Sequence, residues 1–135
     1  MGNGKSLTAD VRENLIDGLR DHPTTLIFLA LCNERPVGIA VCFRGFSTFA
    51  AKPLFNIHNI YIVPEMRGNG FGRLLLENIE AEARATGCCK LTLEVLENNK
   101  PARCVYSSFG FSQAVYVADA GGALFMAKSL QKSEI

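Results

Sequence analysis

A glycine-rich stretch in the middle of the chain has the residue types and the spacing of an anion-binding site. An apolar run is followed by three alternating glycines, Gly68, Gly70 and Gly72. A helical pattern begins between the last two of them, near Phe71. Glycines allow backbone N–H groups to turn toward a ligand, and a helix N-terminus adds a partial positive charge. With Arg67 as a side-chain donor at its start, the stretch predicts a site for a pyrophosphate group.

Two common nucleotide-binding motifs fit this stretch less well. A Walker loop would carry Lys and Ser or Thr directly after the glycines, and the chain has neither there. A Rossmann site shares the order of strand, glycines and helix, and Glu94 ends the next predicted strand. The residues 64–67, however, separate the apolar strand from Gly68, and this spacing favours another kind of site.

The stretch resembles the acyl-CoA signature of the GNAT acetyltransferases, which reads Arg/Gln-x-x-Gly-x-Gly/Ala after a strand. Arg67, Gly70 and Gly72 fill its defined positions. A second signature of the family follows at the expected spacing, filled by Asn99, Ala102, Val105, Tyr106, Gly110 and Phe111. The resemblance covers roughly residues 6–130, which is nearly the whole chain.

The resemblance implies an α/β fold with a mixed, mostly antiparallel twisted sheet and helices on both faces. Acetyl-CoA is the implied cofactor, and it enters between the strand before the glycines and the strand after the helix. A backbone N–H of Ile60 or Ile62 is expected to face the thioester oxygen. Asn99 is expected near the cofactor, although capping the next helix is a sufficient role for it. The full set of expected cofactor-binding residues is Ile60, Tyr61, Ile62, Arg67, Gly68, Asn69, Gly70, Phe71, Gly72 and Asn99.

Acyl transfer to an amine also needs a base for the amine and an acid for the leaving thiolate. An alkylammonium has a pKa of about 10, so a base or a water chain must take its proton near neutrality. We expect His58 to be this base, because it lies on the strand where related acetyltransferases carry Glu or His; a structural or merely exposed histidine is the alternative. Tyr106 resembles the family tyrosine that protonates the departing sulfur, and packing with Val105 and Phe109 is the alternative.

The implied function is acetyl-CoA-dependent N-acetyl transfer, directly to a primary amine of a small molecule. A protein or peptide N-acetyltransferase and a non-catalytic acyl-CoA-binding regulatory domain are the alternatives. The segment around the strand looks closest to the diamine (polyamine) acetyltransferase branch, but His58 and Asn59 replace its Glu-Asp pair. Four phenylalanines either line an apolar substrate pocket or belong to the hairpin core: Phe43, Phe46, Phe49 and Phe55.

Hydrophobic periodicity places these residues on alternating helices and strands. The expected helices begin near Thr8, Phe71 and Asn99, and they end at His22, Gly87 and Phe109. Strands are expected at 24–32, 37–43, 54–63 and 90–95, with a final hairpin of 113–118 and 124–129.

Three details of this assignment can be checked. The apolar run 24–32 is typical of a strand that is covered on both faces. The central helix is expected to bury Leu74, Leu75, Ile79 and Ala83. In the strand 54–63, His58 and Ile60 would share one face of a regular strand, yet the first is polar and the second apolar. A β-bulge and ordinary half-burial explain this change equally well.

Length and composition indicate one globular domain, 1–135, with residues 1–5 as a disordered lead. Hydrophobic residues make up 48% of the chain, and the formal net charge of +1 gives no general attraction to nucleic acid or to anionic membranes. No apolar run is long enough for a membrane helix, and no signal peptide is recognisable. The five cysteines are irregularly spaced, so we expect neither a disulfide nor a metal site, and a cytoplasmic location.

The chain departs from the family at its start. Family members usually begin with a strand and a helix before the helix predicted near Thr8, and this chain has no residues for either. We therefore expect an unpaired sheet edge and insufficiently covered apolar surface, around Leu26–Leu31 or on the first helix, and a homodimer or a longer native chain that covers it.

Overall fold

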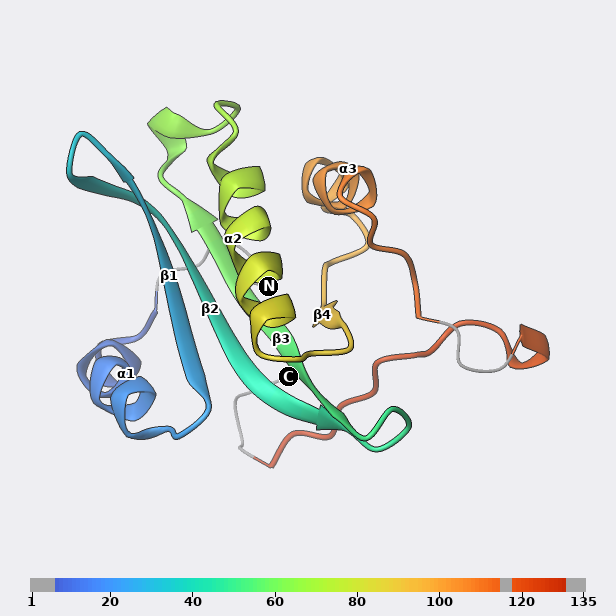
Figure 1. Cartoon of the computed structure of the whole chain (residues 1–135). Helices are drawn as coiled ribbons and strands as arrows, with labels where there is room; N and C mark the ends of the chain where they lie inside the picture. Colours follow the sequence, from blue (N-terminus) through green and yellow to red (C-terminus); the bar gives the residue numbers. More distant parts are fainter. Residues whose placement is uncertain (1–6, 115–117, 131–135) are drawn as a thin grey trace.

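A curved four-stranded sheet forms the centre of the computed structural model, which describes residues 7–114 and 118–130 (Figure 1). Its strands are β1 (Thr25–Cys32), β2 (Arg35–Ser47), β3 (Lys52–Ile62) and β4 (Leu91–Leu93), and they lie side by side in chain order. The first three are antiparallel. β4 lies parallel to β3, because the chain returns through the helix α2 (Phe71–Ala85) between them.

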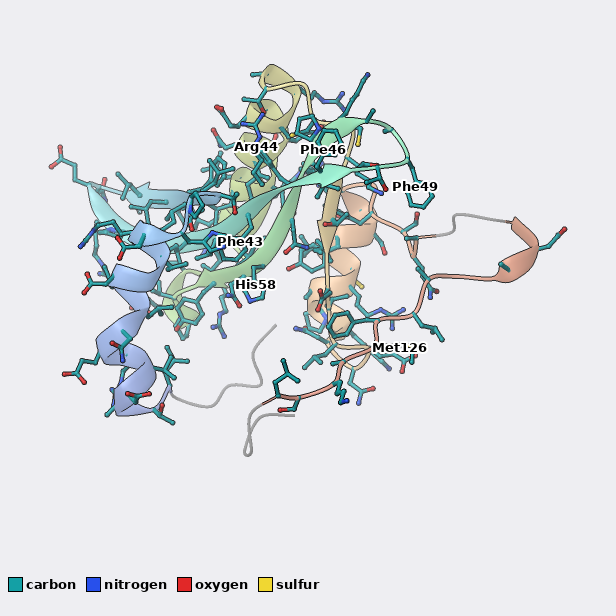
Figure 2. The ribbon with its side chains drawn as sticks, turned by 90° about the horizontal axis from the view of Figure 1, so that it is seen from below. Phe43, Arg44, Phe46, Phe49, His58 and Met126 are labelled. Carbon is teal, nitrogen blue, oxygen red and sulfur yellow. The ribbon has the colours of Figure 1, made fainter. Side chains whose placement is uncertain are left out.

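Helices lie on both faces of the sheet but cover them unequally. α2 packs across one face, while α1 (Ala9–Asp21) lies on the other side, beside β1 (Figures 1 and 2). α3 (Lys100–Ser108) follows β4, and short 3-10 turns occur at Pro64–Met66 and Ala118–Ala120. This mixed, mostly antiparallel sheet with helices on both faces confirms the predicted fold class. Among the described residues, none of the helices is long and apolar enough to span a membrane.

The predicted helix ends are confirmed by their geometry. The Thr8 side chain accepts a hydrogen bond from the Val11 N–H at 3.4 Å, and so caps α1. Gly87 follows α2 with a φ of 79°, in the left-handed region where glycine is favoured. On the exposed side of α2, Glu80 and Arg84 lie four residues apart and form an ion pair at 2.8 Å.

The core lies between α2 and the sheet. Phe55 and Ile57 of β3 are fully buried against α2, together with Cys42 of β2. The helix buries Leu75, Leu76, Ile79 and Ala83. The prediction that Leu74 belongs to this face is wrong: Leu74 is 45% exposed and Leu76 takes its place. In a run of three leucines, periodicity alone does not decide which two face the sheet.

A β-bulge interrupts β3 at His58. The pairing with β2 runs Val41↔Asn59 and then Cys42↔Ile57, so His58 is an extra residue without its own partner. The bulge also reverses the alternation: Ile57 faces the core before it, and Ile60 packs against the core after it. Of the two explanations for the change of pattern in this strand, the bulge is therefore the correct one.

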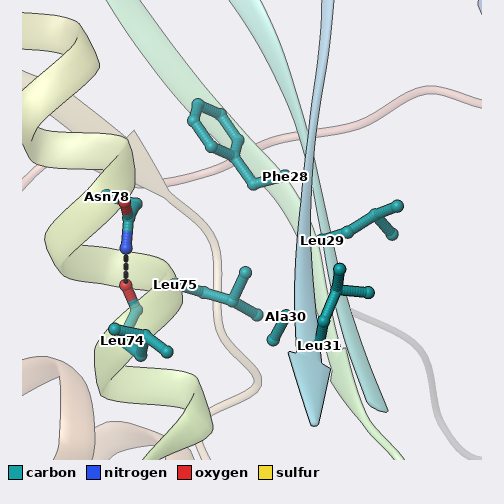
Figure 3. Close-up of a pocket in the computed structure, with 7 residues that line it drawn as sticks. All are labelled: Phe28, Leu29, Ala30, Leu31, Leu74, Leu75 and Asn78. Atoms are coloured by element: carbon teal, nitrogen blue, oxygen red, sulfur yellow. Dashed lines mark hydrogen bonds between the residues drawn. The ribbon is translucent and has the colours of Figure 1, made fainter. Parts of the chain in front are cut away.

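The strand β1 is covered on one face only, so the prediction of two covered faces is wrong. Its outward side chains Ile27, Leu29 and Leu31 are 48%, 57% and 55% exposed. α1 lies on this side but buries none of its own residues, so it does not seal the face. A pocket of about 170 Å³ opens between the outer edge of β1 and α2 (Figure 3). It is lined by Phe28, Leu29, Ala30, Leu31, Leu74, Leu75 and Asn78.

The C-terminal hairpin predicted at 113–118 and 124–129 is not formed. Residues 115–117 lie outside the described part of the chain, and 124–129 run without strand structure. Among the described residues, the Ala123 N–H, directly before the second segment, donates to the Ala114 carbonyl of the first at 2.7 Å. The adjacent strand β4 has three residues instead of the predicted six, so it offers a very short edge for further pairing. The expected disordered lead, residues 1–5, also lies outside the described residues.

Candidate active site

The strands β3 and β4 separate halfway along β3, and this split is the centre of the candidate site. They pair only from Phe55 to Ile57 of β3. Beyond this point, β3 continues to Ile62 with β2 on one side only (Figure 1). The Val63 N–H donates to the Val37 carbonyl of β2 at 2.9 Å, and backbone groups alternate in direction along a strand. The N–H groups of Ile60 and Ile62 therefore point away from β2, toward the split.

A loop with left-handed glycines joins the end of β3 to α2. Gly68 and Gly70 have φ values of 80° and 86°, which glycine adopts without a steric penalty. The first helical hydrogen bond of α2 runs from the Leu74 N–H to the Gly70 carbonyl, so the N–H groups of Phe71, Gly72 and the following residue have no partner inside the helix. A Cβ atom built on any of the three glycines would meet nothing within 4 Å, so this helix start is open to a ligand.

Two side chains predicted to bind the cofactor also hold the loop itself. Arg67 donates from Nε to the Ile62 carbonyl at 2.9 Å, and its guanidinium lies 5.4 Å from the centre of the Tyr61 ring. Asn69 donates from Nδ2 to the carbonyl oxygens of Met66 and Arg67, at 3.2 and 3.4 Å. The backbone of Tyr61 is paired with β2, so only its side chain, beneath Arg67, is near the loop.

Sequence reasoning missed Arg73, a second cation at the helix start. It lies in the first turn of α2, and its guanidinium is 5.3 Å from the centre of the Phe109 ring at the end of α3. The available signal was the position itself: the first helical turn usually favours acidic residues, and here it has none and carries an arginine. Two arginines, Arg67 and Arg73, thus flank the glycine loop.

The bulge places His58 in a row of rings. The ring centres of His58 and Phe43 are 5.5 Å apart at an interplanar angle of 65°, and those of Phe43 and His22 are 5.1 Å apart at 67° (Figure 2). His22, for which the sequence suggested no role, is therefore the second histidine of this row. Its Nδ1 lies 3.1 Å from the Thr24 hydroxyl oxygen.

The four phenylalanines with two possible roles separate in the structure. Phe55 is fully buried in the core beneath α2. Phe46 lies near the end of β2 and is 63% exposed, and Phe49 lies in the turn that joins β2 to β3 and is 86% exposed. Phe43 is the one that contacts His58.

The residues of the second motif lie on α3 and directly before and after it. Tyr106 is half-buried against Phe111, with ring centres 5.9 Å apart, and burial raises the pKa of its phenol above the ordinary value. The hydroxyl therefore keeps its proton at neutral pH. Asn99 caps the helix, since its Oδ1 accepts a hydrogen bond from the Ala102 N–H at 3.3 Å. Among the described residues, no hydrogen bond or ring contact joins Tyr106 to His58.

Comparison with known proteins places this chain in a family. Residues 4–111 match the model of the Acetyltransferase (GNAT) family. The chain belongs to the GNAT acetyltransferases. Its two GNAT signatures lie on different elements, the first in the loop from β3 into α2 and the second on α3 and the residues that flank it.

The GNAT relatives are named for different acceptors. The thialysine N-epsilon-acetyltransferase of Bos taurus is 32% identical over 74 residues, which are 55% of this chain and 43% of the relative. The ribosomal protein bS18-alanine N-acetyltransferase of Haemophilus influenzae is 36% identical over 81 residues, which are 60% and 51% of the two chains. This chain spans about half the length of the curated relatives it matches.

Solved GNAT structures share the fold over most of the chain. The crystal structure of a probable acetyltransferase has a TM-score of 0.78 and 22% identity, and covers 98% of this chain and 83% of that one. An aminoglycoside acetyltransferase from an uncultured soil metagenomic sample has a TM-score of 0.74 and 15% identity, with coverage of 96% and 79%. At these identities the likeness shows the fold alone.

Proposed function

We propose that this protein is an acetyl-CoA-dependent N-acetyltransferase that transfers the acetyl group directly to a primary amine of a small molecule. The observation that carries this proposal is the split beside β3, with an open helix start at its end and a histidine on the bulge at its beginning. These features supply a place for the phosphates, an edge for the pantetheine and a base for the amine.

The backbone groups that line the split support acetyl-CoA as the ligand that binds there. The unpaired N–H groups at the start of α2, with Arg67 and Arg73 beside them, suit the pyrophosphate. The outward N–H groups of Ile60 and Ile62 and the outward carbonyl of Ile60 suit the pantetheine amides, as a neighbouring strand would, while the Ile62 carbonyl already accepts from Arg67. Because its Oδ1 already caps α3, Asn99 has only its Nδ2 left to offer the cofactor.

The transfer then divides among three groups. His58 takes a proton from the ammonium, and the amine nitrogen attacks the thioester carbonyl carbon. An outward N–H of Ile60 or Ile62 stabilises the oxyanion that forms. When the C–S bond breaks, Tyr106 gives its proton to the thiolate, and the second proton that the attacking nitrogen loses on forming the amide restores the phenol, which burial keeps protonated.

We propose a small-molecule acceptor rather than a protein terminus. The relatives include enzymes named for each class. The Phe43 ring contacts His58, and the His22 ring contacts Phe43 in turn, so the surface beside the candidate base includes a row of rings that suits a small amine body.

A thiol-release assay tests the proposed function. Purified protein with acetyl-CoA and a panel of small primary amines should release free CoA in an amine-dependent way, and mass spectrometry should find the acetylated amine. Release with a peptide N-terminus but with no small amine would favour the protein-acetyltransferase alternative. Tight binding of acetyl-CoA without release for any acceptor would favour the regulatory alternative.

We also propose that the protein forms a homodimer in the cytoplasm. The strand β1 ends the sheet, and between Thr25 and Cys32 it carries no charged residue and no proline to discourage pairing. A second copy that pairs antiparallel with this edge would extend the sheet and place its own side chains beside Ile27, Leu29 and Leu31. All five cysteines are free, and Cys42 is buried in the core, which suits a reducing compartment.

A further inference from the structure

The candidate base lies on the face of the sheet opposite α2. Cys42 of β2 is buried beneath α2, so strand alternation directs its neighbour Phe43 to the opposite face. Ile57 and Ile60 on either side of the bulge also face α2, which leaves His58 on the side of Phe43. Figure 2 shows these two labelled side chains on the side of the sheet away from α2. An acceptor that reaches His58 must therefore lie along this face.

The strands that form this face contain no acidic residue. From Arg35 to Ile62, β2, β3 and their turn carry three cations and neither Asp nor Glu. The next acidic residue along the chain, Glu65, is already paired with Arg35 at 3.1 Å. The sheet therefore offers an approaching cation no carboxylate partner near His58.

The helix on this side does not supply the missing charges. Leu19 is the half-buried residue of the apolar line of α1, so this line faces the sheet. Helical periodicity places the carboxylates on the far side of the helix, where Asp17 pairs with Arg20 at 2.9 Å. These carboxylates belong to Asp10, Glu13, Asp17 and Asp21.

The ring of Phe43, beside the candidate base, is oriented by its contacts with two other rings. Phe43 is half-buried and meets both His22 and His58 in edge-to-face geometry, at 5.1 and 5.5 Å. Aromatic rings that meet in this way hold a preferred direction and offer a large apolar surface. A substrate whose amine reaches His58 would lay its body against Phe43.

We propose that the acceptor is a monoamine with an apolar or aromatic body that packs against Phe43, and that polyamines are poor acceptors. This assignment rests on the proposed function, because it takes His58 as the place where the amine is deprotonated. Phe43 is then a specificity-determining residue. It acts on the binding of the acceptor and not on the binding of acetyl-CoA.

The test compares three amines: 2-phenylethylamine, ethylamine and spermidine. With acetyl-CoA, kcat/KM for 2-phenylethylamine should exceed that for spermidine at least tenfold. Phe43→Leu keeps an apolar side chain and should lower kcat/KM for 2-phenylethylamine by about tenfold, mainly through KM, with little change for ethylamine. Phe46→Leu, on the same strand but toward the hairpin turn, is the matched control and should change neither value. Spermidine turnover equal to that of 2-phenylethylamine, or an equal loss for all amines in Phe43→Leu, would overturn the proposal.

A binding measurement separates this inference from the proposed function. Calorimetric titration of the CoA-saturated protein with 2-phenylethylamine and with spermidine requires no turnover. Binding of 2-phenylethylamine that weakens about tenfold in Phe43→Leu supports the acceptor class even if no amine is acetylated, in which case only the proposed function fails. Tighter binding of spermidine would refute the acceptor class, whatever the activity. If Phe43→Leu does not fold, the relative affinities of the wild-type protein for the two amines still test the proposed acceptor class.

Discussion

The two faces of the sheet differ in what covers them. Beneath α2, Phe55 and Ile57 lie against Leu76 and Ile79 with essentially no exposed surface. On the opposite face, His58 is exposed, and α1 leaves the outward side of β1 open. The first face holds the fold together, because buried apolar area is the main source of stability. The second face is free to carry chemistry and association, so substitutions on the two faces should have separable effects.

The largest expected effect is a loss of the acetyl-transfer rate, without a loss of stability, when His58 on the open face is replaced. His58→Ala should lower the rate by a factor of about 100 to 10,000, as is typical when a general base is lost, while acetyl-CoA affinity and thermal stability hardly change. The loss should be greatest near and below neutrality. Raising the pH toward the alkylammonium pKa of about 10 should restore part of the rate, because more amine arrives deprotonated.

Tyr106→Phe serves as the comparison in the same pH–rate profiles. It removes only a hydroxyl, so folding should persist while thiol release slows, and higher pH should not rescue it. Because burial raises the pKa of Tyr106, the wild-type phenol keeps its proton below its ordinary pKa of about 10, and its ionisation should not lower the rate there. If His58→Ala reacts as fast as the wild-type protein on the low-pH side of the profile, His58 is not the base.

The covered face should show the reverse pattern, a loss of stability. Ile79→Ala deletes a fully buried side chain beneath α2 and should lower the free energy of unfolding by about 2–5 kcal/mol. Leu74→Ala, one turn away on the same helix, is the matched control and should cost less than about 1 kcal/mol, since Leu74 is largely exposed. Urea titrations followed by circular dichroism would measure both. Equal losses would mean that the helix is buried on a different side.

At the glycine loop between β3 and α2, two effects of a larger side chain can be separated, namely backbone strain and the blocking of acetyl-CoA binding. Gly70→Val and Gly87→Val both place a branched residue at a positive φ, 86° and 79°, in open space. Each should cost about 1–2 kcal/mol of stability from left-handed strain. Only Gly70→Val should also weaken acetyl-CoA binding, by at least tenfold, because its side chain would occupy the proposed pyrophosphate position. Calorimetry that finds unchanged affinity in folded Gly70→Val would contradict the loop assignment.

The smallest effect concerns association through β1. Leu29→Lys puts a charge on the open edge strand and should weaken the dimer at least tenfold, with a change in monomer stability within about 0.5 kcal/mol. Ile16→Lys on α1 replaces a similarly exposed apolar residue away from the strand edge and is the control. Sedimentation velocity over a range of concentrations would report the association. A wild-type protein that stays monomeric at high concentration would refute the dimer.

The sequence predicted best those features that depend on neighbours along the chain. Helix starts and stops carry their own chemical signals, and Thr8, Asn99 and Gly87 were placed correctly for that reason. The glycine loop was likewise visible, because its spacing and its backbone conformation are both local properties.

Features that depend on distant parts of the chain were less predictable. The choice between Leu74 and Leu76 follows from how α2 meets the sheet, which periodicity does not decide. His22 joined the site only because β2 brings Phe43 to the end of α1. The C-terminal hairpin was predicted from the residues of its own segments. A strand also needs a neighbouring edge to pair with, and those segments do not reveal that β4 has only three residues.

The bulge in β3 has a consequence for how the chain can change. Without His58, the strand would read Phe-Asn-Ile-Asn-Ile-Tyr-Ile, an unbroken alternation with every apolar residue but the tyrosine on the core side. The candidate base is therefore a single-residue insertion into an otherwise regular strand. A deletion of one codon would leave the apolar residues of this strand in phase with the core and remove the histidine together with the bulge. The proposed base could therefore be lost in one step without loss of the fold.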